Sequence, residues 1–496
     1  MLRLRKLEIT VYFSVYIAYL IYGLWKLYQV RNDIIRTAIF QFAEGWKLLE
    51  RPRDDSNDEL ENFTAYIIGN WHWYVLHIFV SIFACNRWPQ YGSIFHALVS
   101  IVALVVKMQL LSLCIITLLL ISYYTMATYN SKLLTWFLSI LWMVSINLIK
   151  NSTYIYAELG YNEYFTLIVM LSWCLLRCCS FTLSCSIDRK TGSLEKHNNT
   201  YTLVNFLGYV LYYPTLVYGP FLEFHRYMTP IQTRRSIEVQ FVKIMQLLWE
   251  LVRVLFWWLV LQLSLHFFYV HYMARDVTAV KLVHPVFGQH AVGYYMGQFF
   301  FLYYIITYGL GIAFAHFDEL NPPSRPRCIG RIHFYSDMWK YFDEGLYEFL
   351  FKHIYCQLCA KNSSLGRKLF ATAATFAFVY AWHGCYTYVL IWSVMNFCCL
   401  VAEKFFKALV ASPAYISRVH SVFGIKGTQY LNAFLATQLF IPAAFSNVYF
   451  ISGKEVGDFL MRGAYMSGWG NYIALSVCSF CFFQCSELIL NVRKQM

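Results

Sequence analysis

The sequence has few charged residues for its length. Asp, Glu, Lys and Arg make up 14% of the 496 residues, and hydrophobic residues make up 59%, whereas a soluble domain carries about 25% charged residues. This composition argues against a water-soluble globule. The net charge of +13 does not indicate nucleic acid, because the basic residues lie mainly in short connections between apolar runs, without a basic stripe or a nucleic-acid motif. It fits the Lys and Arg excess of cytoplasmic loops in membrane proteins.

Zinc-binding patterns and a signal cleavage site are also absent. Most of the 15 cysteines lie inside apolar runs, where cysteine is a small hydrophobe. The single Cys356-x-x-Cys359 has no second pair or His at zinc-finger spacing, so we predict no zinc. A basic N-terminus and the apolar run from Ile9 to Trp25 resemble a signal peptide, but no small-residue cleavage site follows. We interpret this run as a retained signal-anchor helix.

Apolar runs near the length of a bilayer crossing, about 20 residues, recur along the chain. They predict an all-α polytopic membrane protein with a single domain over residues 1–496, about 10–12 transmembrane helices and one or two re-entrant segments. The run at 202–223 is the re-entrant candidate, because Pro214 and Pro220 break it. The runs span residues 9–28, 65–85, 93–106, 108–129, 133–149, 164–186, 202–223, 244–272, 291–316, 368–382, 386–402, 429–451 and 471–490.

The charges of the connections orient these runs. Basic residues precede the first run and follow the last, so we predict that both termini are cytosolic. Alternating the side of the membrane at each crossing gives the same topology whether the crossings are counted from the N-terminus or from the C-terminus. The long connection 317–367 is then cytosolic, and the turn around His383 is lumenal.

Two stretches of the sequence contain ionisable residues that are candidates for catalysis, although the surrounding runs are apolar. His383 ends the stretch Phe376 to Gly384 at the junction of two apolar runs, and ionisable groups at membrane depth are costly and usually serve a site. The alternative is a histidine satisfied by a helix–helix hydrogen bond. In the cytosolic connection, Trp339, Asp343 and Tyr347 are spaced four apart and would share one face of a helix. The alternative there is an amphipathic helix on the membrane surface.

Together the two features resemble the membrane-bound O-acyltransferase family, specifically its Hedgehog acyltransferase branch. The resemblance implies a helical bundle with a central tunnel and a catalytic core at about 200–470, with His383 and Asp343 as catalytic residues. Two departures from the branch are Cys385, where it has Gly, and Lys340, where it often has Arg. The similar stretches are Tyr212–Pro220, Pro322–Cys328, Met338–Asp343, Ala374–Gly384, Ser446–Asn447 and Gly453–Gly457.

The resemblance also implies the substrates. Palmitoyl-CoA is the acyl donor, and the acceptor is the N-terminal cysteine amine of a secreted signalling protein of the Hedgehog type, or of an EGF-like ligand, in the lumen of the endoplasmic reticulum or Golgi. His383 is the candidate general base. Trp339 would line the acyl slot, Asn447 would donate a hydrogen bond to the thioester oxygen, and Lys340 would contact CoA. Membrane lipids are the remaining partners, and no nucleic acid is expected.

The resemblance further implies that Cys328 ligates a haem iron, since thiolate is an established axial ligand. The alternative is a free or S-acylated cysteine at the membrane edge. A lipid or lipid-anchor acyltransferase of the same superfamily is the nearest enzymatic alternative. A transporter is the other class, because Arg177 lies inside the run 164–186, although no internal repeat is evident.

Overall fold

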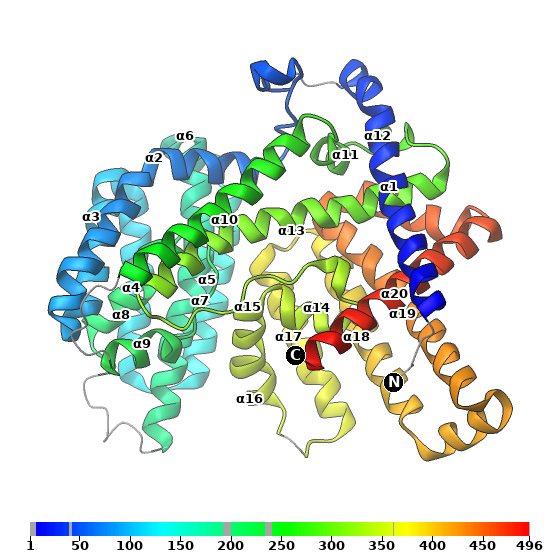
Figure 1. Ribbon diagram of the computed structural model, residues 1–496. Helices are drawn as coiled ribbons and strands as arrows, with labels where there is room; N and C mark the ends of the chain where they lie inside the picture. The colour runs from blue at the N-terminus through cyan, green and yellow to red at the C-terminus, as the bar shows by residue number, and fades with distance from the viewer. Residues whose placement is uncertain (1–5, 39–41, 192–199, 234–240, 361, 496) are drawn as a thin grey trace.

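The computed structural model describes residues 6–38, 42–191, 200–233, 241–360 and 362–495. Within them, the regular secondary structure is helical apart from one isolated β-bridge, Ala43 with Arg53 (Figure 1). The helices are α1 (Lys6–Thr37), α2 (Asp58–Val80), α3 (Gly92–Lys107), α4 (Leu110–Tyr129), α5 (Lys132–Lys150), α6 (Thr153–Leu159), α7 (Tyr161–Thr191), α8 (Leu203–Val210), α9 (Phe224–Thr233), α10 (Phe241–Leu265), α11 (Val270–Arg275), α12 (Val277–Lys281), α13 (Val286–Phe317), α14 (Tyr335–Phe342), α15 (Glu344–Phe349), α16 (Cys356–Leu358), α17 (Leu365–His383), α18 (Thr387–Val410), α19 (Pro413–Met466) and α20 (Trp469–Gln495).

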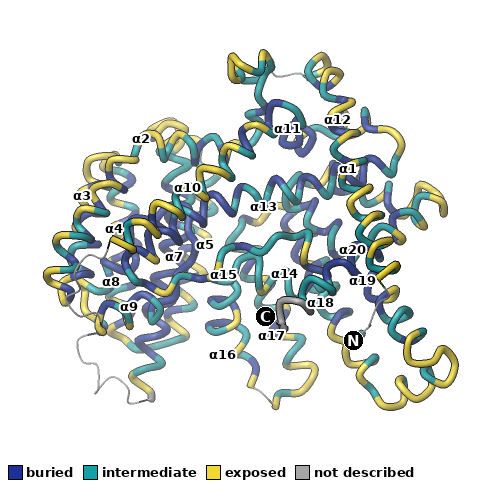
Figure 2. The backbone as a smooth tube through the Cα atoms, in the orientation of Figure 1, coloured by how far each residue is buried: buried dark blue, intermediate teal, exposed yellow. Residues whose placement is uncertain are grey.

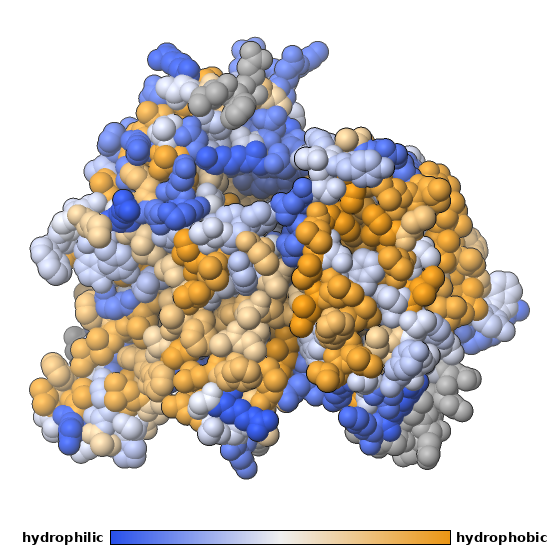
Figure 3. All heavy atoms as spheres, turned by 180° about the vertical axis from the view of Figure 1, so that it is seen from behind, coloured by the Kyte–Doolittle hydropathy of each residue, from blue (hydrophilic) through white to orange (hydrophobic). Residues whose placement is uncertain are grey.

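Eleven helices of the described residues are long and apolar enough to cross a membrane. This confirms the predicted all-α polytopic class. Apolar side chains gather in broad areas across the face shown in Figure 3, with hydrophilic side chains above and below them. Helix α10 exposes apolar side chains such as Leu248, Val252 and Phe256. In a membrane, lipid covers a surface of this kind.

Helix α13 runs across the middle of the molecule, between the group α2–α9 and the group α14–α20 (Figure 1). It packs along α10 on one side and against α19 and α1 on the other. Most residues of α13 and α7 are buried, whereas the outer helices carry most of the exposed residues (Figure 2). A helix buried on all sides inside a bundle can present side chains to an internal cavity.

The run predicted at 202–223 is broken, as its prolines indicate. Helix α8 ends at Val210, a 3₁₀ turn follows at Tyr213–Thr215, and α9 begins at Phe224. The guanidinium of Arg177, on α7, donates to the carbonyl of Val210 at 3.0 Å and to Oγ1 of Thr215 at 2.9 Å. The buried charge therefore satisfies the carbonyls that the break frees, as a broken helix inside a membrane protein requires.

The segment around Asp343 differs from the prediction. Trp339, Asp343 and Tyr347 were expected on one face of a single helix, but α14 ends at Phe342, and Asp343 has an extended backbone (φ −128°, ψ 82°). The Asp343 carboxylate accepts the backbone N–H of Leu346 at 2.9 Å and so caps α15. Asp is among the best N-cap residues, so the residue that ends one helix begins the next.

Candidate active site

The position of His383 follows from the way α17 ends. Gly384 has φ +115°, a backbone conformation that a residue with a Cβ rarely adopts, and it stops the helix at His383. The last carbonyls of α17 receive donors from α5: the Asn147 amide donates to the carbonyl of Ala381 at 3.0 Å, and the Lys150 ammonium donates to that of His383 at 3.2 Å. Helix α5 thus fixes the depth at which the histidine lies.

Aromatic rings hold the His383 imidazole. Its centroid lies 4.7 Å from that of Trp382, 4.9 Å from that of Phe450 and 5.6 Å from that of Trp392. The ring of Trp382 is itself fixed, because its Nε1 donates to the carbonyl of Ser172 at 3.1 Å. Within the described part of the chain, no hydrogen bond involves the imidazole nitrogens. Packing alone orients the ring, and its nitrogens remain available to a reacting group.

Asp343 accepts two hydrogen bonds that tie it to different elements. One is the α15 cap described above, and the other comes from the hydroxyl of Tyr308, on α13, at 2.7 Å. Burial raises the pKa of the Asp343 carboxyl, and these two hydrogen bonds oppose the rise. The sequence did not identify Tyr308, because nothing in its run distinguishes it from the neighbouring Tyr303 and Tyr304.

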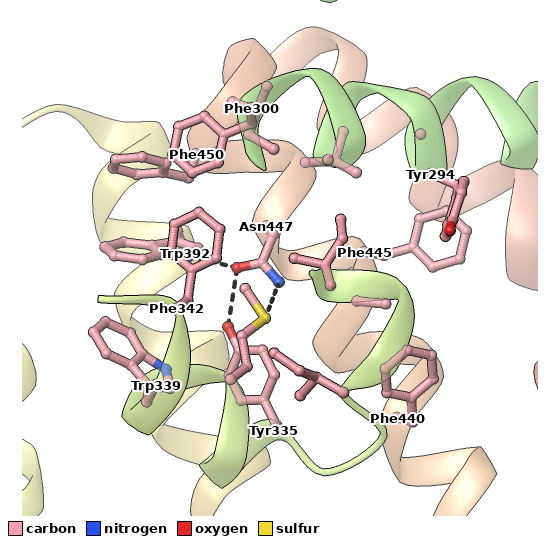
Figure 4. A pocket seen from close by; sticks show the side chains of 18 of the residues that line it. Tyr294, Phe300, Tyr335, Trp339, Phe342, Trp392, Phe440, Phe445, Asn447 and Phe450 are labelled. Carbon is pink, nitrogen blue, oxygen red and sulfur yellow. Dashed lines mark hydrogen bonds between the residues drawn. The ribbon is translucent and has the colours of Figure 1, made fainter. Parts of the chain in front are cut away.

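Trp339 and Asn447 belong to one polar network between α14, α18 and α19. Trp339 Nε1 donates to Oδ1 of Asn396 at 3.0 Å. The hydroxyl of Tyr335 donates to Oδ1 of Asn447 at 3.1 Å, and Trp392 Nε1 donates to the same oxygen at 3.3 Å (Figure 4). The network holds both predicted residues against one cavity wall.

The amide nitrogen of Asn447 has neighbours of its own. It donates to the carbonyl of Ala443 at 3.2 Å and lies 3.7 Å from the sulfur of Met338 (Figure 4). A thioether is a weak acceptor, so a thioester oxygen would compete mainly with this sulfur. The hydrogen bond from Asn447 to the thioester oxygen stays a prediction, and the Met338 sulfur is the acceptor that this oxygen would replace.

An apolar cavity contains four of the predicted residues: His383, Asp343, Trp339 and Asn447 all line it. Its remaining wall is almost wholly aromatic and aliphatic, from α1, α13, α14, α18, α19 and α20, and Figure 4 shows the rings from Trp392 and Phe450 at one side to Tyr294 and Phe440 at the other. Tyr347, on α15, lines the same cavity. Such a space suits a long hydrocarbon chain.

A second cavity is more polar and meets the first at the histidine. Its lining includes Asp58, Glu59 and Arg275 from α2 and α11, together with Lys150. His383 lines both cavities, as do Trp382, Phe450 and Tyr308. Asp343 lines the apolar cavity only, and Arg177 lines neither. The imidazole therefore stands in the wall between an apolar space and a polar one.

Lys340 and Cys328 lie apart from these cavity residues. Lys340 is exposed, with its Nζ 5.0 Å from the ring centroid of Tyr341, and neither residue lines a cavity. The sulfur of Cys328 lies 4.0 Å from Oε1 of Gln298, and the adjacent Ile329 lines the apolar cavity. Thiolate is an established axial ligand of haem, and the haem predicted at Cys328 stays a prediction. Burial raises the pKa of this thiol, and the Gly330 N–H and Arg331 lower it.

Comparisons with known proteins identify the family of the chain. The family model described as "MBOAT, membrane-bound O-acyltransferase family" matches residues 99–446. The chain is 52% identical to the protein-cysteine N-palmitoyltransferase Rasp of Drosophila melanogaster, over 98% of this chain and 96% of that protein. It is 28% identical to the protein-cysteine N-palmitoyltransferase HHAT of Mus musculus, over 72% of each. The membrane-bound O-acyltransferase GUP2 of Saccharomyces cerevisiae is 23% identical over 42% of this chain and 33% of its own.

Proposed function

The chain belongs to the membrane-bound O-acyltransferase family, and from this premise we propose that it transfers palmitate from palmitoyl-CoA to the N-terminal amine of a protein that begins with cysteine. The relatives named above as protein-cysteine N-palmitoyltransferases support this acceptor. The acceptor is a secreted signalling protein of the Hedgehog type. Residues 1–496 form one acyltransferase domain with the catalytic core at about 200–470. One hydrophobic cluster that runs from Leu27 to Leu475 supports the single domain.

The observation that carries the proposal is the place of His383 between the two cavities. An acyl-CoA and a protein N-terminus differ in polarity, so an enzyme that joins them needs an apolar space and a polar space with one catalytic group at their boundary. The polar cavity contains two acidic side chains, Asp58 and Glu59, and two basic ones, Lys150 and Arg275, with Asp58 and Arg275 paired. The polar space beside the histidine suits a hydrophilic acceptor such as a protein N-terminus.

The apolar cavity supplies the binding energy for the donor. Burying a sixteen-carbon chain, at about 0.8 kcal/mol for each methylene, gains roughly 10 kcal/mol. Polar CoA must stay in water at the cytosolic side, where Lys340 would contact it. The predicted topology puts Asp343 towards that side and His383 towards the lumen of the endoplasmic reticulum. The bilayer then separates the two substrates until the thioester reaches the histidine.

The reaction is an aminolysis. The neutral N-terminal amine attacks the thioester carbonyl, the new C–N bond forms, and the C–S bond breaks. His383 takes the proton that the nitrogen loses and returns one to the departing CoA sulfur. General base catalysis of this kind contributes about 10²–10⁴-fold, and an α-amino group with a pKa of about 7.7–8.0 requires no stronger base. Asn447 polarises the carbonyl, and Asp343 positions the segment that lines the thioester.

Haem is the proposed prosthetic group, held by the Cys328 thiolate. Haem supplies no step of an aminolysis, so its role there is structural. A Soret band in the purified protein that disappears in Cys328→Ala would support the assignment. If the wild-type protein lacks that band, Cys328 is instead a free or S-acylated cysteine.

The test of the function is transfer to defined peptides. Purified protein is incubated with labelled palmitoyl-CoA and a peptide beginning with cysteine, beside the same peptide N-acetylated. The expected product is a hydroxylamine-resistant amide on the first peptide and none on the second. Label in lipid, with none on either peptide, would instead identify a lipid acyltransferase.

A further inference from the structure

Three buried side chains from three separate helices meet in the α2–α9 half of the molecule. His77 lies on α2, His96 lies on α3, and Asp318 directly follows α13. Each has an exposed fraction of 1%. One potential ligand atom from each lies within 4.8 Å of the others. None of the three lines either cavity, so the cluster is separate from the candidate active site.

Both imidazoles direct the same nitrogen at the same oxygen. Nε2 of His77 lies 2.7 Å from Oδ2 of Asp318, and Nε2 of His96 lies 3.8 Å from that oxygen. In a tetrahedral zinc site with bonds of 2.0–2.1 Å, two ligand atoms lie about 3.3 Å from each other. The two nitrogen–oxygen distances here are one shorter and one longer than this spacing. At 3.8 Å, Nε2 of His96 is within ion-pair range of the carboxylate but beyond the ordinary length of a direct hydrogen bond.

An outer set of hydroxyl groups holds the three side chains. The hydroxyl of Tyr227 lies 3.0 Å from Nδ1 of His96, and when Nδ1 carries the proton, the lone pair of Nε2 faces Asp318. The hydroxyls of Tyr212 and Ser81 both donate to the Asp318 carboxylate. Metal-binding histidines and carboxylates are oriented in this way by outer partners. Residues Ser81–Cys85 form a π-helical turn, which occurs frequently at functional sites.

We propose that His77, His96 and Asp318 bind one Zn²⁺ ion, with the fourth position open to water. Imidazole nitrogen and carboxylate oxygen are established zinc ligands, and one carboxylate lowers the charge that must be buried. The ion would join α2, α3 and the end of α13, beside the broken segment that contains Tyr212. This departs from the sequence prediction of no zinc. His96 and Asp318 lie 19 and 241 residues further along the chain than His77, so the three ligands form no local motif.

Metal content tests the proposal without reference to acyl transfer. Full-length protein, purified in detergent with zinc in the growth medium and then desalted, is measured by plasma mass spectrometry. We expect about one zinc ion per chain, and a loss of about tenfold or more in His96→Gln. His353→Gln is the matched control, because His353 is also 1% exposed and belongs to no such cluster; it should retain the ion. Wild-type protein with no stoichiometric metal would overturn the proposal, as would His96→Gln with undiminished zinc.

A second measurement uses the wild-type chain alone, so a variant that fails to fold does not leave the question open. Cobalt exchanged for zinc should give the visible absorption bands of a tetrahedral site with nitrogen and oxygen ligands. A strong chelator should lower the thermal midpoint of the wild-type protein, and added zinc should restore it. Absence of the bands, together with a midpoint that the chelator does not change, identifies a hydrogen-bonded network without metal.

Discussion

The hydroxyl of Tyr308 donates a hydrogen bond to Oδ2 of Asp343 at 2.7 Å, which ties the central helix α13 to the start of α15. The other carboxylate oxygen of Asp343 caps α15 through the N–H of Leu346. A single side chain therefore links the helix that crosses the molecule to the segment that lines the apolar cavity. Its structural and functional roles can be separated by the choice of substitution.

Asp343→Ala should lower both stability and transfer, whereas Asp343→Asn should lower transfer alone. Alanine removes the cap and costs about 1 kcal/mol of folding free energy, while Asn is as good a cap as Asp. Thermal midpoints and peptide acylation rates measure the two effects. Equal midpoints for the two variants would show that the cap contributes nothing. Full activity of Asp343→Asn would show that transfer does not need the second acceptor oxygen, which takes the hydrogen bond from Tyr308.

His383→Ala should fold normally and lose about a hundredfold or more of the transfer rate, the low end of a general base contribution. Its ring is held by aromatic packing rather than hydrogen bonds, so truncation leaves no buried polar group without a partner. His72→Ala, at an exposed position of α2, is the control and should keep its activity. Near-normal transfer to a Cys-initiated peptide by folded His383→Ala would exclude this residue from the mechanism.

Ala444→Phe should shift the donor preference towards shorter acyl chains. Ala444 lines the apolar cavity, and a ring there displaces several methylenes, each worth about 0.8 kcal/mol when buried. The ratio of palmitoyl to lauroyl transfer should fall about tenfold or more. Val422→Phe, an exposed site on the same helix, should leave the ratio unchanged. An unaltered ratio in Ala444→Phe would mean that the acyl chain lies elsewhere.

The Glu223–Lys352 ion pair should make stability depend on pH. Burial by itself raises the pKa of Glu223, but the Lys352 ammonium, with smaller contributions from His225 and His353, holds the pKa below its ordinary value. A carboxyl whose pKa is depressed by folding stabilises the protein above the pKa of the unfolded chain, about 4.3. That contribution is lost as pH falls through the folded value.

We therefore expect Lys352→Met to lower the thermal midpoint at pH 7, and the difference from wild type to shrink as pH falls below about 4.3. Lys454→Met is the matched control, because its pair with Asp458 is exposed and exposed pairs contribute little. A wild-type advantage over Lys352→Met that persists unchanged at low pH would contradict the assignment of the pair.

Composition and periodicity were sufficient for the fold class, because a bilayer requires long apolar helices whatever their arrangement. The same runs located the break at 202–223 from its prolines. The histidine at a junction of two apolar runs and the Asp343 segment were also visible in the sequence. The structure brings His383, Asp343, Trp339 and Asn447 to one cavity, although their chemical roles stay predictions.

Tertiary structure alone decided what surrounds those residues. Helical spacing predicted Trp339, Asp343 and Tyr347 on one face of a continuous helix. The carboxylate of Asp343 instead accepts a backbone N–H and begins a new helix, and all three residues still line the cavity. The polar cavity draws on α2 and α5, far outside the core predicted at about 200–470. The tyrosine that holds Asp343 and the meeting of His77, His96 and Asp318 depend on packing between helices distant in the chain, and packing of that kind leaves no periodic trace in a sequence.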